Sequence, residues 1–199
     1  MKDRLLRKLP LHRSSIKFVY NPNLYITDWK DFNNGDIDIS GGCRECVKSV
    51  HLINKKNIKV YFDGFKENAL PKRKGLYNKQ CECAVFPINS DTKEWVLFVE
   101  TKYANNLRAA LNPANDYPRC MVKQIKETVA YFREYEIISS SKVVNAIVSF
   151  PNLIEDFNSW IFQNSDETEL DILLNYKIII RGTNTAEIVD DINIYLLSD

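Results

Sequence analysis

Three charged side chains in the middle of the sequence are spaced so that they can act together on a metal ion. Glu100 and Lys102 lie two residues apart in the segment EWVLFVETKY, residues 94–103. Its aromatic and β-branched residues predict a strand, and side-chain alternation along a strand directs Glu100 and Lys102 to one face. Glu82 lies in the preceding apolar segment, residues 80–88 (QCECAVFPI). A short polar turn separates the two segments and predicts an antiparallel hairpin, which brings Glu82 toward the other two if the register allows.

Two carboxylates that meet on one sheet surface repel each other, and a divalent cation relieves that repulsion. Oxygen ligands favour a hard ion such as Mg²⁺, or Mn²⁺ in its place. A lysine beside the metal-bound water can orient it and stabilise developing negative charge, which is metal-assisted phosphodiester hydrolysis in outline. The simpler alternative is a solvated strand face on which Glu100 and Lys102 neutralise each other.

The surrounding segments predict an α/β arrangement of strand, strand, strand, helix, strand. Residues 57–65 alternate apolar and polar side chains, as a strand does. Residues 119–136 carry an apolar stripe at helical spacing, formed by Met121, Val122, Ile125, Val129 and Phe132. Residues 142–150 form an apolar run typical of a strand buried on both faces. A helix near 152–162 and a strand at 176–181 follow, whereas residues 43–54 are ambiguous between helix and strand.

This pattern resembles the PD-(D/E)xK (restriction-endonuclease-like) nuclease superfamily over residues 57–151. In that family an acidic residue on one strand is followed by a hairpin, by Glu-x-Lys at the end of an apolar strand, and then by a helix and a further strand. The resemblance implies a restriction-endonuclease-like core, with a mixed central β-sheet flanked by helices. It also implies a Mg²⁺-dependent nuclease in which Glu82 and Glu100 hold the metal, Lys102 completes the catalytic set and Gln124 contacts the substrate.

The sequence departs from the family pattern in three respects, the first being that no proline or aspartate precedes Glu82 in the usual form. Glu82 stands where aspartate is usual, and the extra methylene shifts the carboxylate. Thr128 stands where one nuclease subgroup has tyrosine, and Tyr131 lies one turn on. The alternative function is therefore a catalytically inactive nuclease fold that serves as a nucleic-acid or protein binding module.

Composition predicts one domain over residues 1–199. We divide it into an N-terminal extension (1–42), a nuclease-like core (43–151) and a C-terminal addition (152–199). No long apolar run predicts a membrane span, and we expect a cytoplasmic protein. Net charge is +1, with a basic start and an acidic end, which permits a basic groove for nucleic acid; a protein partner or a homodimer is the other expectation.

Other side chains offer weaker candidate sites. Asp63 in the first predicted strand is either a further metal ligand or a residue that caps the strand end. The basic loop Lys72-Arg73-Lys74 is either a phosphate contact or solvated. Four thiols match the number that a structural zinc needs, but the second pair lacks knuckle spacing, and burial as small apolar residues is the preferred interpretation: Cys43, Cys46, Cys81 and Cys83.

Overall fold

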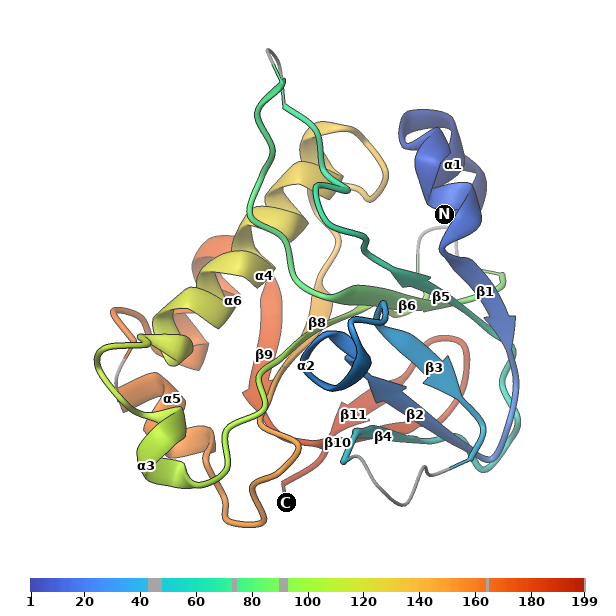
Figure 1. The fold of residues 1–199 in the computed structure, drawn as a ribbon. Coiled ribbons are helices and arrows are strands. Elements are labelled where there is room, and N and C mark those ends of the chain that lie inside the picture. The colour runs from blue at the N-terminus through green and yellow to red at the C-terminus, as the bar shows by residue number, and fades with distance from the viewer. Residues whose placement is uncertain (43–47, 73–74, 90–92, 164, 199) are drawn as a thin grey trace.

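A computed structural model describes residues 1–42, 48–72, 75–89, 93–163 and 165–198 of the chain. Two β-sheets and a set of helices make up the described part (Figure 1). The helices are α1 (Lys2–Lys8), α2 (Lys30–Asn33), α3 (Leu107–Ala110), α4 (Tyr117–Glu134), α5 (Asn158–Gln163) and α6 (Glu169–Tyr176), and a 3₁₀ helix, η1, spans Pro10–Ser14.

The larger sheet, sheet A, contains the strands that the sequence predicts for the nuclease-like core. Its strands are β1 (Ile16–Val19), β5 (Val60–Gly64), β6 (Cys83–Pro87), β7 (Leu97–Thr101), β8 (Val144–Ser149) and β9 (Ile178–Gly182), in the order β1-β5-β6-β7-β8-β9. The pairs β1–β5, β5–β6 and β6–β7 are antiparallel, whereas β7, β8 and β9 run parallel to one another. The α4 crossover supplies the long connection that parallel pairing of β7 and β8 requires.

The smaller sheet, sheet B, is assembled from distant parts of the chain. Its strands are β2 (Asn23–Thr27), β3 (Asp38–Ser40), β4 (Val50–Ile53), β10 (Thr185–Ile188) and β11 (Ile194–Leu196), in the order β11-β10-β4-β2-β3. β10 pairs with β4 in parallel, and β4 pairs with β2 antiparallel. All three predicted segments of the chain therefore contribute strands to one sheet.

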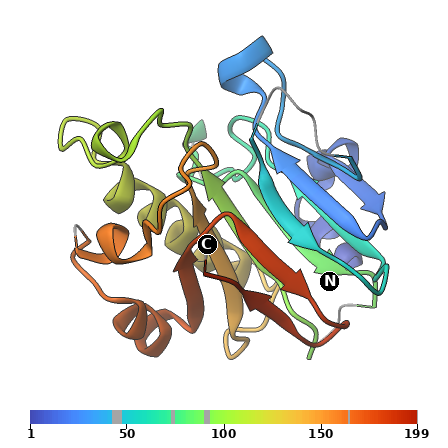
Figure 2. The ribbon, with the colours of Figure 1, turned by 90° about the horizontal axis from the view of Figure 1, so that it is seen from below.

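The layers are helices, sheet A and sheet B. Alternate residues of each central strand of sheet A enter different cores: Phe98 packs toward α4, whereas Leu97 and Val99 pack toward sheet B. The apolar stripe of α4 is buried as its periodicity predicts, since Ile125 and Phe132 are fully covered. Figure 2 shows the strands of sheet B on one side of sheet A, and α5 and α6 on the other.

The predicted α/β class and the mixed sheet are confirmed, as is the order of three strands, helix and strand. The sequence analysis does not anticipate the second sheet, which β4 forms together with strands from both ends of the chain. The ambiguous segment is a strand in its described part, residues 50–53. Among the described residues, no helix is long and apolar enough to cross a bilayer.

Candidate active site

Glu82, Glu100 and Lys102 meet at one end of sheet A. Glu100 lies in β7, Lys102 follows that strand, and Glu82 immediately precedes β6. β6 and β7 pair as the predicted antiparallel hairpin, with Cys83 opposite Val99. Extending that register by one residue sets Glu82 opposite Glu100, which explains why the two carboxylates lie together.

Lys102 joins the two carboxylates. Its Nζ donates to Glu100 Oε1 over 2.6 Å and to Glu82 Oε1 over 3.4 Å. The Glu100 side chain is fully buried, whereas those of Glu82 and Lys102 are 22% and 27% exposed. The cluster therefore reaches solvent through Glu82 and Lys102, with Glu100 at its base. We call these three residues the acidic triad.

The triad holds two acids against one base. Burial raises the pKa of Glu100 to about 8, and the nearby charge of Lys102 offsets only part of that effect. Burial also raises the pKa of Glu82, with Lys102 opposing the shift. Burial alone would lower the pKa of Lys102, but the charges of Glu100 and Glu82 raise it above its usual value. Lys102 therefore stays charged near neutral pH, and the proton that balances the triad resides on the carboxylates, chiefly on Glu100.

One carboxyl oxygen of Glu100, Oε2, is buried and has no hydrogen-bond partner among the described residues. A buried carboxylate oxygen without a donor is costly, and a cation beside it would remove that cost. The donor set, two carboxylates with an unused oxygen, fits a hard divalent ion. Across the described ranges, however, no three His, Cys, Asp or Glu side chains are already arranged as a set of metal ligands.

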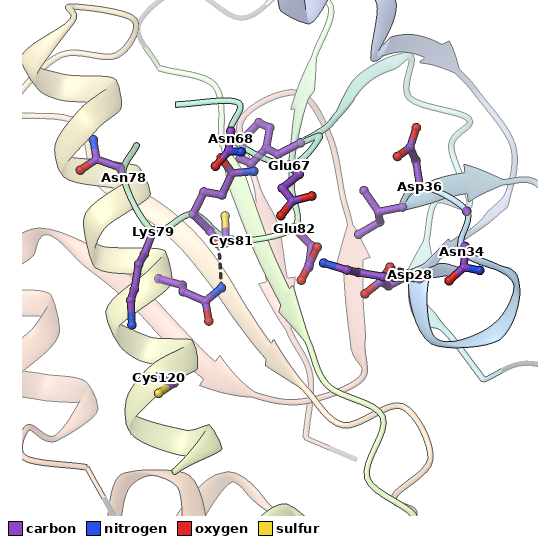
Figure 3. Close-up of a pocket in the computed structure, with 16 residues that line it drawn as sticks. Asp28, Asn34, Asp36, Glu67, Asn68, Asn78, Lys79, Cys81, Glu82 and Cys120 are labelled. Atoms are coloured by element: carbon purple, nitrogen blue, oxygen red, sulfur yellow. Dashed lines mark hydrogen bonds between the residues drawn. The ribbon is translucent and has the colours of Figure 1, made fainter. Parts of the chain in front are cut away.

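Of the triad, Glu82 lines a pocket of about 520 Å³ between α4 and the segment around α2 (Figure 3). Glu82 and Asp28 both line it, and Figure 3 shows them close together, with Lys79 and Cys120 on the side of α4. Asp28 follows β2 and is almost fully buried. Its negative charge contributes to the raised pKa of both Glu82 and Glu100. The sequence does not single out Asp28, because nothing local relates sheet B to the end of β7.

Gln124, the predicted substrate-binding residue, also lines the pocket. Its Nε2 donates to the backbone carbonyl of Gln80 over 2.8 Å. Thr128, one turn further along α4, is fully buried, and its Oγ1 accepts from the backbone amide of Cys81 over 2.9 Å. Both side chains of α4 thus contact the segment that leads into Glu82.

Asp63, the candidate further metal ligand, belongs to a different cluster. It is fully buried in β5, where its Oδ2 lies 2.6 Å from His12 Nδ1 and its Oδ1 accepts from Ser15 Oγ over 2.7 Å. His12 Nε2 lies 3.1 Å from the carbonyl of Ala69. We call His12, Ser15 and Asp63 the histidine clamp. The sequence assigned no role to His12, whose partner lies 51 residues away.

The remaining candidates divide between buried and undescribed residues. Cys81 and Cys83 are free and buried, as expected for small apolar residues. Strand alternation would place Cys81 and Cys83 on one face, but Cys83 packs toward sheet B and Cys81 toward α4, because Cys81 precedes the regular strand. Four further candidates lie outside the described residues: Cys43, Cys46, Arg73 and Lys74. Lys72 lines a separate hollow beside Tyr131 rather than the pocket of Glu82.

Comparison with known proteins gives no relative from which to infer a function. No protein-family model, curated protein or solved structure matches the chain. The acidic triad and its pocket therefore carry the functional argument by themselves.

Proposed function

We propose that the protein is a metal-dependent nuclease of the PD-(D/E)xK type, which hydrolyses phosphodiester bonds in nucleic acid. The single observation that carries this proposal is the contact of Lys102 Nζ with both glutamates: Glu82, which lines a pocket, and Glu100, whose buried Oε2 has no hydrogen-bond partner among the described residues. Glu82 and the unpaired oxygen of Glu100 are hard oxygen ligands, which a divalent cation would take in place of the proton that Glu100 holds near neutral pH.

Glu82 and Glu100 would hold the Mg²⁺ or Mn²⁺ ion, which when bound acts as a Lewis acid and supplies a reactive water. Lys102 orients that water and stabilises negative charge that develops on the phosphate. Asp28 adds a third negative charge on the pocket side of Glu82. Lys30 and Lys79 line the same pocket and are suited to contact phosphate oxygens.

The order of elements supports the proposal. An acid before β6, the hairpin, Glu-x-Lys at the end of β7, the helix α4 and the parallel strand β8 follow the pattern of the family that the sequence resembles. Glu100 and Lys102 stand where that family carries its catalytic pair, and Glu82 stands where it carries the first acid. Restriction-endonuclease-like topology is accordingly part of the proposal.

The test is a cleavage assay with purified protein, single- and double-stranded DNA and RNA, and Mg²⁺ or Mn²⁺. We expect cleavage that EDTA stops and that falls at least about 10²-fold in Lys102→Ala, the loss typical of removing one electrostatic group from a transition state. Lys126→Ala is the matched control, because Lys126 also pairs with a glutamate, Glu167, but lies away from the pocket. Cleavage that survives Lys102→Ala would remove the assignment.

One observation favours a second candidate, a nuclease fold without catalysis that binds nucleic acid or a protein. Lys102 already pairs with both glutamates, and the described residues hold no ready set of three metal ligands. Calorimetry with Mn²⁺ separates the two functions. Absence of metal binding by the folded protein, together with retention of a labelled oligonucleotide or formation of a homodimer, would favour the binding module.

A further inference from the structure

One peptide group, between Gln80 and Cys81, is held at both of its polar atoms by side chains of α4. Its carbonyl oxygen accepts from Gln124 Nε2 over 2.8 Å, and its N–H donates to Thr128 Oγ1 over 2.9 Å. Gln124 and Thr128 are one helical turn apart, so they project from the same flank of α4. Two bonds to opposite ends of one peptide plane fix both its position and its rotation.

The direction of these bonds is determined by the helix itself. Thr128 Oγ1 donates its proton to the carbonyl of Gln124 over 2.8 Å. Its lone pair is therefore the group presented to Cys81, and the hydroxyl cannot switch roles without losing the bond within the helix. Thr128 is fully buried, which makes an unpaired amide at Cys81 costly.

The held peptide group is separated from Glu82 by one residue, Cys81, at the point where the chain enters sheet A. The Glu82 amide donates to the carbonyl of Val99 over 3.0 Å, and its carbonyl accepts from Phe65 over 2.8 Å. Beyond this point the ladder ends, since β6 begins at Cys83. On the other side, the chain is tied by Gln80, whose side chain bonds to the backbone of Lys66 and Leu70. The contacts from α4 thus add a restraint between these two sets of bonds, and they fix the direction in which the main chain approaches Glu82.

We infer that Gln124 and Thr128 are positioning residues, which act on the metal site through Glu82 rather than through contact with substrate. This inference rests on the proposed function, because it holds that the α4 contacts position Glu82, one of the two carboxylates that would bind the metal. It also changes the role of Gln124 from the substrate contact implied by the family resemblance. Partners that orient a ligand without touching the metal commonly change affinity by about 10- to 100-fold when removed.

The test is Mn²⁺ titration calorimetry on the full chain, with thermal unfolding as a check on folding. Thr128→Val removes the hydroxyl at nearly constant volume, and Gln124→Met removes the amide donor at a partly exposed position. Both should weaken Mn²⁺ binding about tenfold or more, whereas Thr128→Ser should retain the wild-type affinity. Glu127→Gln is the matched control, because Glu127 bonds the backbone of Lys79, further from Glu82.

Kinetics with an oligonucleotide distinguishes positioning from substrate contact. The inference predicts that Gln124→Met raises the Mn²⁺ concentration needed for half-maximal rate and leaves KM for the oligonucleotide unchanged at saturating metal. A raised KM with unchanged Mn²⁺ affinity would overturn it, even if Thr128→Val fails to fold. Wild-type protein that binds no Mn²⁺ would overturn the proposed function itself. Wild-type binding that neither variant weakens would overturn only the positioning role.

Discussion

Sheet A contains two buried clusters of ionisable side chains, and they differ in how completely they are satisfied. In the histidine clamp, both oxygens of Asp63 and both nitrogens of His12 have partners. In the acidic triad, Lys102 faces two glutamates, and Glu100 Oε2 has no partner within the described part of the chain.

The histidine clamp and the acidic triad also differ in how completely their charges are balanced. Ionised Asp63 and the carbonyl of Ala69 both accept hydrogen bonds, so His12 satisfies both only when each ring nitrogen carries a proton. Burial alone would lower the pKa of His12, but the hydrogen bond and charge of Asp63 raise it above 6.5. The clamp thus balances one positive and one negative charge, and it fastens the N-terminal segment to β5 and to the loop after it. A closed cluster is structural, whereas the excess acid of the triad favours a cation.

Asp63→Ala should produce the largest loss of stability. It leaves His12 and Ser15 without their shared buried partner, and removing one member of a buried ion pair costs about 3–5 kcal/mol. Urea denaturation measures the change in the free energy of unfolding. Added Mn²⁺ should not restore the lost stability, since Asp63 is occupied by His12; restoration by metal would place Asp63 in the metal site instead.

Lys102→Met should destabilise the metal-free protein less, by about 1.5–3 kcal/mol, the range for hydrogen bonds to charged groups. The carboxylates of Glu82 and Glu100 can take up protons when the lysine is lost, because burial already raises the pKa of both. In contrast with the clamp, Mn²⁺ should recover stability. The measurement is the same denaturation with and without metal, and identical curves would argue that the triad does not bind it.

Changing pH should separate the clusters further. His12 has a raised pKa, so its stabilisation is complete below 6.5 and is lost as pH rises through the raised value. Glu100 keeps its proton in the folded state up to about 8, so its effect also lowers stability as pH rises from about 4.5 to 8. His12→Asn should remove the first slope, and Glu100→Gln the second, in plots of unfolding free energy against pH. Saturating Mn²⁺ should abolish only the slope that Glu100→Gln removes.

Asp28→Asn should have the smallest effect. Asp28 adds negative charge near Glu82 and Glu100 across the boundary between the sheets. Loss of a charge interaction on the order of 1 kcal/mol corresponds to about fivefold weaker Mn²⁺ binding. Calorimetry should show that decrease with no loss of thermal stability. A complete loss of binding would instead make Asp28 a direct ligand.

Features that depend on local periodicity can be predicted from the sequence. Alternation along residues 94–103 determined that Glu100 and Lys102 share a face, and the short turn before them determined the hairpin that brings Glu82 alongside. The helical stripe of α4 and the apolar run of β8 were likewise predictable, because burial of one or both faces leaves a period in the sequence.

Features that depend on packing between distant segments become visible only in the folded structure. Sheet B joins β4 to β10, more than a hundred residues apart, and so carries Asp28 to the triad. Gln124 and Thr128 bond to Gln80 and Cys81 because α4 packs against the chain before Glu82. His12 contacts Asp63 because the N-terminal segment packs against β5. These contacts leave no periodic signal in the sequence, because each joins single residues that become neighbours only when the layers pack together.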